Sequence, residues 1–153
     1  MTLEELYRNI GGDYAQALRV LHVEKLVDKH IRKYPKNGVV DAVLEAGKTM
    51  DPTQLFEAAH AVKGISANLG LTGLSDLAAE LTEEFRPGNA RRHSDAEIAE
   101  ILRKMESLYR KTAQEIQKDE EWQKKMMHIE VKVSQNPDFQ DIAFFHHLIF
   151  QKQ

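Results

Sequence analysis

The 153-residue sequence contains no cysteine, which excludes disulfide bonds, thiolate catalysis and zinc or iron–sulfur sites with cysteine ligands. It also lacks an excess of charge of one sign, because the formal net charge is −3 and no basic run is present to neutralise nucleic-acid phosphates. The first twenty residues contain no apolar segment, so they predict neither a signal peptide nor a membrane anchor. We therefore expect a cytoplasmic protein that binds neither nucleic acid nor a membrane.

The chain also lacks a Gly-x-x-x-x-Gly-Lys-Ser/Thr sequence, so no ATP site is visible and no ATP-dependent kinase activity of its own is expected. Apolar residues make up 42% of the sequence and charged residues 29%, which is typical of a soluble globular protein. This length accommodates one ordinary domain with a core of its own, and is short for two. The sequence therefore predicts one domain and a tail.

Strand signals are almost absent from the first four-fifths of the sequence, whereas helix-capping signals are frequent. Thr2 with Glu5 and Asp13 with Gln16 have the spacing of capping boxes, and Asp51-Pro52 combines an N-cap with a proline at the first helical position. Short connections favour antiparallel neighbours, so we predict an all-α antiparallel bundle with a four-helix core and short N-terminal helices. The predicted helices run from Thr2 to Gly11, Asp13 to about Lys33, Val39 to Thr49, Asp51 to Gly70, about Gly73 to Arg86, and Ser94 to about Lys118.

The character of the sequence changes after about Lys118. The stretch IEVKVSQNPDF alternates as a strand does, but no partner strand is apparent. The later stretch IAFFHHLIF is densely apolar and is expected to pack on the bundle or on another copy of the chain. We therefore place a helical domain at residues 1–118 and a tail of unassigned structure at residues 119–153.

One helical stretch, EAAHAVKGISANLGL, contains a glycine that costs the helix about 1 kcal/mol relative to alanine. On a helical wheel, His60 lies opposite the apolar stripe and is expected to reach solvent. Lys63 and Gly64 lie one turn beyond His60 on the same surface. The stripe expected to face the core consists of Leu55, Ala59, Val62, Ser66 and Leu69.

The combination of an exposed imidazole, an ammonium group and a missing side chain suits phosphoryl chemistry. An imidazole with a pKa near 6.5 is largely neutral at neutral pH, so one ring nitrogen of His60 can attack a phosphoryl group directly. The ammonium group of Lys63 can then meet the charge on the phosphoryl oxygens. Gly64 leaves room for a partner to approach the ring in line.

The pattern AHAVKGISANLGL, with His60, Lys63, Gly64, Asn68 and Gly70, resembles the motif of histidine-containing phosphotransfer (HPt) domains. The resemblance extends over residues 1–118. It implies a helical bundle of HPt type and a phosphorelay phosphocarrier in two-component signal transduction. It further implies transfer to or from the aspartate of response-regulator receiver domains, or acceptance from a hybrid sensor histidine kinase, with Mg²⁺ in the receiver and no cofactor in this chain.

By this resemblance His60 is the phospho-acceptor, Lys63 stabilises the phosphoryl group and Gly64 provides access. Many family members carry a glutamine or glutamate that hydrogen-bonds the imidazole, and the matching position here is Thr82, whose hydroxyl is shorter. Phe56 is either a core residue at the edge of the stripe or an anchor for a partner. The candidates for contacts with the imidazole or with a partner are Phe56, Glu57, Ala67, Asn68 and Thr82.

Each of these features also has a plainer interpretation, because an isolated helical histidine or lysine is usually a solvated surface residue. The adjacent histidines His146 and His147 suggest a metal site, but adjacent residues on a helix point apart and no metal-ligand spacing is present. No metal site is expected. Two functions therefore remain: a phosphocarrier that uses His60, and a helical adaptor of HPt shape that binds receiver domains or other signalling proteins without being phosphorylated.

Overall fold

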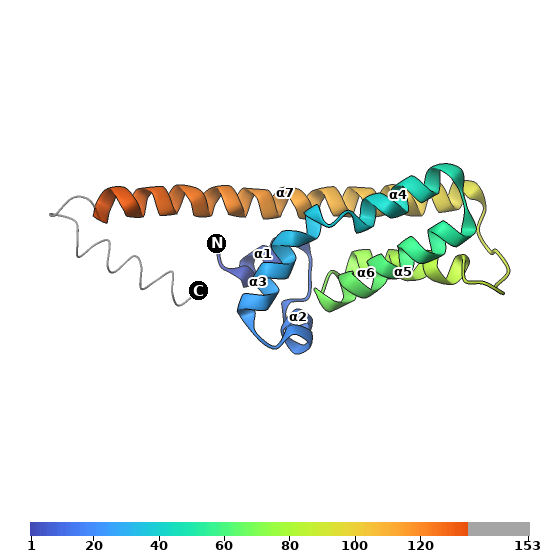
Figure 1. Cartoon of the computed structure of the whole chain (residues 1–153), viewed down its shortest axis with the longest axis horizontal. Helices are drawn as coiled ribbons and strands as arrows, with labels where there is room; N and C mark the ends of the chain where they lie inside the picture. The colour runs from blue at the N-terminus through green and yellow to red at the C-terminus, as the bar shows by residue number, and fades with distance from the viewer. Residues whose placement is uncertain (135–153) are drawn as a thin grey trace.

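The computed structural model describes residues 1–134, and this part of the chain is helical and contains no strand. This confirms the predicted all-α class. Figure 1 shows α4–α7 side by side as a bundle, with α1–α3 packed at one end of it. The elements are α1 (Leu3–Ile10), α2 (Tyr14–Leu21), α3 (Glu24–Lys33), the short 3₁₀ helix η1 (Tyr34–Lys36), α4 (Val39–Thr49), α5 (Pro52–Asn68), α6 (Thr72–Glu84) and α7 (Asp95–Ser134).

Side-chain caps begin several helices where the sequence predicts them. Thr2 and Glu5 form a reciprocal capping box on α1, and Ser94 and Glu97 exchange the corresponding hydrogen bonds at α7. The Asp51 carboxylate accepts a hydrogen bond of 3.1 Å from the backbone N–H of Gln54 at the start of α5. These caps satisfy donors that the first turn of a helix leaves without partners.

The buried face of α5 is the predicted stripe, and two tyrosines hold its C-terminal half. Tyr7 of α1 donates a hydrogen bond of 2.8 Å to the carbonyl of Leu69, and the hydroxyls of Tyr34 and Ser66 are 2.8 Å apart. These contacts join α5 to distant parts of the chain and fix its rotation about its own axis. The stripe consists of Leu55, Ala59, Val62, Ser66 and Leu69, all of which are buried.

Gly70 ends α5 with a φ of 68°, the left-handed conformation expected from the sequence. A second constraint applies there, because the backbone N–H of Asp13 donates a hydrogen bond of 2.7 Å to the Gly70 carbonyl. A Cβ atom at residue 70 would lie 2.1 Å from the Asp13 carbonyl oxygen. Gly70 is therefore required both by its φ and by the close approach of the chain that enters α2.

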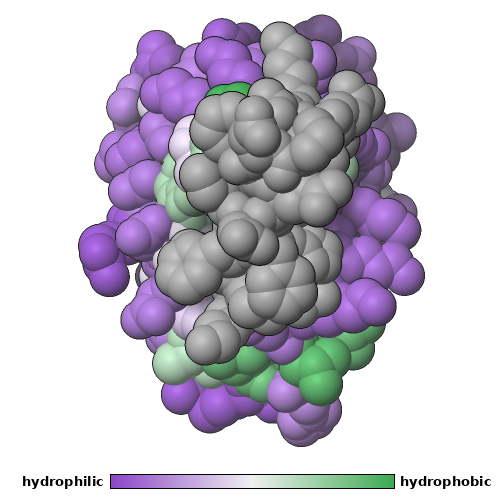
Figure 2. Space-filling model, turned by 90° about the vertical axis from the view of Figure 1, so that its left-hand side faces the viewer, coloured by the Kyte–Doolittle hydropathy of each residue, from purple (hydrophilic) through white to green (hydrophobic). Residues whose placement is uncertain are grey.

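The single helix predicted from Asp13 to about Lys33 is wrong, because the chain breaks between α2 and α3. His22 has a φ of 70° and ends α2, and α3 begins at Glu24. Val23 and Leu26 at this corner are 50% and 39% exposed. Figure 2 shows a largely hydrophilic end of the molecule, with hydrophobic side chains gathered towards the lower edge, the side on which Figure 1 places α2 and α3.

The predicted change of structure near Lys118 is also wrong, because α7 continues without a break to Ser134. Asp119 is 1% exposed and accepts a hydrogen bond of 2.6 Å from Arg32 of α3, so it belongs to the helical domain. The alternating residues 129–134 form helix and not strand. The apolar stretch from Ile142 to Phe150, expected to pack on the bundle or on another copy, lies outside the described residues, as do His146 and His147.

Candidate functional site

The candidate site lies on the exposed face of α5, in the middle of the helix. His60 is exposed, as the helical wheel predicts, and Lys63 is half-buried one turn beyond it. The hydroxyl of Ser75 on α6 donates a hydrogen bond of 3.4 Å to the Lys63 carbonyl, so α6 packs beside this part of α5. The structure therefore places an imidazole and an ammonium group together on a surface that a partner protein can reach.

Gly64 is exposed, and a Cβ atom built on it would meet no atom within 4 Å. Its φ is not in the left-handed region, so neither its conformation nor a close neighbour requires glycine. This contrasts with Gly47 of α4, where a Cβ would lie 2.4 Å from the Leu102 Cδ1 atom. The open space beside His60 is what an access role for Gly64 needs.

Phe56 stacks on the imidazole of His60, with ring centroids 5.9 Å apart and planes inclined by 19°. Phe56 is half-buried and packs against the core, so it lies at the edge of the core and touches the site at the same time. Stacking on a ring that is itself held by the core limits how the imidazole can turn. Phe56 is therefore a residue at the edge of the core, and its role as an anchor for a partner stays a prediction.

A charge pair at the C-terminal end of α6 lies beside this stack, with Glu83 in the last turn and Arg86 just after it. The Arg86 guanidinium lies 5.5 Å from the centroid of the Phe56 ring, and its Nη2 atom donates a hydrogen bond of 2.7 Å to the Glu83 carboxylate. This hydrogen bond, together with the charges of Arg86 and Lys63, holds the pKa of Glu83 below its usual value. The same pairing raises the pKa of Arg86. Glu83 is thus ionised at neutral pH and faces both cations.

The expectation that Thr82 touches the imidazole or a partner is wrong. Its side chain is fully buried, and its hydroxyl donates a hydrogen bond of 2.7 Å to the Ala78 carbonyl one turn earlier. Glu57, Ala67 and Asn68 are exposed on α5 and remain available to a partner. Asn68 also lines a pocket of about 360 Å³ whose other walls are Leu21, His30, Lys33, Asn37, Ile65 and Leu69.

Comparison with protein-family models gives a match to the Hpt domain over residues 36–117, which extend from the end of η1 into α7 and include all of α5 and α6. The chain belongs to the Hpt domain family. No curated protein and no solved structure matches the chain. His60, Lys63 and Gly64 of this Hpt domain all lie within the matched residues, and so do Glu83 and Arg86.

The described part of the Hpt domain contains no cluster of three side chains able to hold a metal ion. Residues 1–134 also include no helix that is long and apolar enough to cross a membrane.

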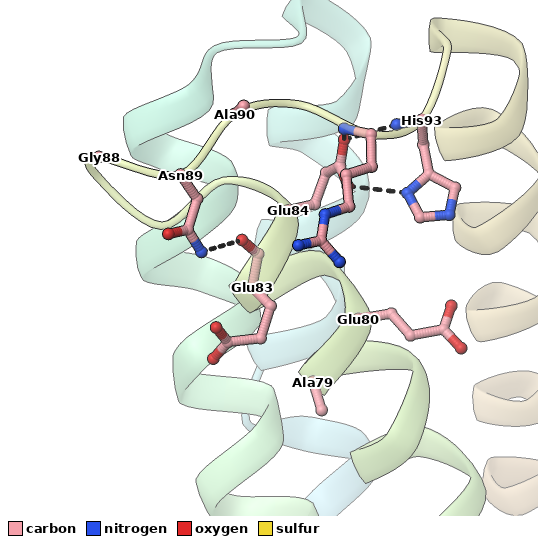
Figure 3. Close-up of a pocket in the computed structure, with 9 residues that line it drawn as sticks. Ala79, Glu80, Glu83, Glu84, Gly88, Asn89, Ala90 and His93 are labelled. Atoms are coloured by element: carbon pink, nitrogen blue, oxygen red, sulfur yellow. Dashed lines mark hydrogen bonds and ion pairs between the residues drawn. The ribbon is translucent and has the colours of Figure 1, made fainter.

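A second polar cluster joins the end of α6 to the start of α7, and Figure 3 shows it. Glu84 has a side chain only 3% exposed, and its carboxylate accepts hydrogen bonds from the backbone N–H groups of Arg92 and His93 at 2.8 and 2.9 Å. The same carboxylate lies 2.7 Å from Nδ1 of His93. Burial alone would raise the pKa of Glu84, but these hydrogen bonds lower it, and the contact with Glu84 raises the pKa of His93. The cluster fixes the loop that separates Arg86 from α7.

Sequence reasoning missed Arg86, because its partners belong to two different helices. The spacing of Glu83 and Arg86 does predict an ion pair within the helix that the sequence places up to Arg86. Nothing in the sequence shows that the pair lies against Phe56, since that depends on how α5 and α6 pack.

Proposed function

We propose that this Hpt domain carries a phosphoryl group on His60 and exchanges it with the aspartate of a response-regulator receiver domain. Membership of the family already indicates a phosphocarrier and not a kinase, and it implies receiver domains as partners. The observation that supports His60 is its exposure in the middle of α5, with Lys63 and the open flank of Gly64 one turn away.

In the proposed reaction, the lone pair of one ring nitrogen of His60 attacks the phosphorus atom of an aspartyl phosphate. The N–P bond forms as the P–O bond to the aspartate breaks, and the aspartate leaves as a carboxylate with the electron pair of that bond. The other ring nitrogen keeps its proton until water removes it. Donation to a receiver is the same step in reverse, so the chain needs no cofactor of its own, and we expect Mg²⁺ to be held by the receiver.

Each neighbour of His60 has a distinct part in this step. The Lys63 ammonium group attracts the phosphoryl oxygens, and the stacked ring of Phe56 keeps the imidazole in a limited range of orientations. Gly64 lets the receiver approach the exposed side of the ring. Ala67 and Asn68 continue the same exposed helix face and are the proposed contacts for the receiver surface.

The test is to incubate the full chain with phosphorylated receiver domains and to map any acid-labile label. We expect one label on His60 and none in the His60→Gln variant, which should fold normally because exposed substitutions usually change stability by no more than about 0.5 kcal/mol. A label on His22 or His93 in that variant would refute the assignment. Tight receiver binding without any label would instead support the adaptor function.

A further inference from the structure

The charged side chains around His60 include a carboxylate whose negative charge would repel a phosphoryl group. Glu83 is hydrogen-bonded to Arg86 at 2.7 Å and 3.2 Å, and its charge interacts with that of Lys63. A phosphoryl group on His60 would attract the same two cations. It would also be repelled by the Glu83 carboxylate.

Arg86 contacts the same phenyl ring that stacks on His60. Its guanidinium lies over the Phe56 ring, and the imidazole of His60 stacks on that ring as well. The contact with Phe56 keeps the planar group near the site while its side chain, which is 41% exposed, retains room to turn.

From this arrangement we propose that Glu83 and Arg86 set the lifetime of the phosphohistidine at His60, Glu83 shortening it and Arg86 lengthening it. The inference rests on the proposed function, since it concerns the phosphorylated form. The two residues are positioning residues at the C-terminal end of α6 and are not expected to form bonds with phosphorus. A carrier must hold the phosphoryl group long enough to meet a receiver and still release it readily, and two opposed charges allow both.

The sign of each effect follows from how the N–P bond breaks. In hydrolysis a water oxygen forms a bond to phosphorus while the N–P electron pair returns to the ring nitrogen. The water proton goes to the released phosphate. The ring leaves most easily when its other nitrogen is protonated, because neutral imidazole then departs. A nearby carboxylate favours that protonated ring and a nearby cation disfavours it.

The charged side chains on this side of α5 come from two helices and from the loop that follows the second. Glu57 and Lys63 belong to α5, Asp76 and Glu83 belong to α6, and Arg86 lies two residues after the end of α6. Only Glu83 and Arg86 form the pair that lies against Phe56.

Glu80 provides a matched control on the same helix. Figure 3 shows Glu83 and Glu80 pointing to opposite sides of α6, with Glu80 directed towards α7, where its charge acts on His93. Glu80→Gln therefore removes the same charge from the same helix without removing it from the His60 side.

The experiment phosphorylates the full chain with phosphoramidate, a small phosphoryl donor that needs no receiver, and follows the loss of label from His60 across a range of pH. We expect Glu83→Gln to lengthen the half-life about two- to fivefold and Arg86→Gln to shorten it by a similar factor, while Glu80→Gln matches the unmodified protein. The pH midpoint of hydrolysis should fall by about 0.5 unit in Glu83→Gln and rise by about as much in Arg86→Gln.

The double variant Glu83→Gln with Arg86→Gln should have a half-life close to that of the unmodified protein. The half-life of Arg86→Lys should be closer to the unmodified value than that of Arg86→Gln, because the positive charge remains. The pH midpoint of hydrolysis does not depend on the fraction of protein that is folded. A merely structural role for the pair would therefore leave this midpoint unchanged. Equal behaviour of Glu83→Gln and Glu80→Gln on a labelled His60 would overturn the inference alone. Failure of His60 to take the label at all would overturn the proposed function, and the inference with it.

Discussion

Replacing Gly64 should change the stability of the protein and the rate of phosphoryl transfer in opposite directions. The residue lies inside α5, its φ is not in the left-handed region, and a Cβ atom there would meet nothing within 4 Å. Gly64→Ala should therefore gain the full difference in helix propensity, about 1 kcal/mol. For a chain of this size that gain corresponds to a rise in Tm of roughly 2–4 °C.

The transfer rate should fall with the size of the new side chain, because residue 64 lies one turn from His60 on the surface that a receiver must approach. Gly64→Gln should slow transfer more than Gly64→Ala, while the Tm stays at or above that of the unmodified protein. Urea or thermal unfolding gives the stability, and transfer of label from a phosphorylated receiver gives the rate.

Gly47→Ala is the matched control for the stability gain. Gly47 is also helical, but a Cβ there would lie 2.4 Å from the Leu102 side chain, so that variant should gain less than Gly64→Ala or lose stability. Unfolding of Gly64→Gln would contradict the open surroundings of residue 64. Unchanged transfer in Gly64→Gln would refute the access role and leave the glycine without a function at this site.

Three further predictions concern the scaffold around the site. His22→Gly should raise the free energy of unfolding by about 1 kcal/mol, since His22 is exposed and has a φ of 70°; an unchanged urea midpoint would show that its backbone is not strained. Asp119→Ala should lower the free energy of unfolding by roughly 2 kcal/mol. This is less than the usual loss for a broken buried ion pair, because the Asp28 carboxylate still contacts Arg32. A loss under about 0.5 kcal/mol would contradict the pairing of Asp119 with Arg32. The loss of stability caused by His93→Asn should be largest between about pH 5 and 6. Because the pKa of Glu84 is lowered, the stability that its carboxylate contributes disappears as the pH falls. Because the pKa of His93 is raised, the stability that its imidazolium contributes disappears as the pH rises. Thermal unfolding of the unmodified protein and of His93→Asn across pH 3–9 checks this prediction. A difference in stability between the two proteins that does not vary with pH would contradict it.

The parts of the fold that local sequence determines were predictable. The caps at Thr2 and Asp51 and the left-handed end at Gly70 each depend on a few neighbouring residues, and all three are confirmed. The exposure of His60 was also predictable, because the period of the apolar residues in α5 fixes which face is buried. Its role in phosphoryl transfer stays a prediction.

The errors arose where distant contacts decide the outcome. Nothing between Asp13 and Lys33 breaks the helical pattern, yet the chain turns at His22, a residue that rarely adopts a positive φ. The charged sequence after Lys118 resembles a tail, but Asp119 is buried against Arg32 of α3. Thr82 was placed at the site by the resemblance to HPt domains, because it matches their glutamine or glutamate position, whereas the rotation of α6 turns it into the core.

The way α5 is held has a consequence for the chemistry. Its buried stripe, the Tyr7 hydrogen bond to Leu69 and the Tyr34 contact with Ser66 all lie on the face opposite His60. A helix held in this way presents the imidazole without any change of conformation, so binding of a receiver need not include a step that exposes the histidine. Changes in the core should therefore lower the amount of folded protein and leave the transfer rate per folded molecule unchanged. Changes at Phe56 and Arg86 should alter that rate, because Phe56 stacks on the imidazole and the Arg86 guanidinium lies over the Phe56 ring.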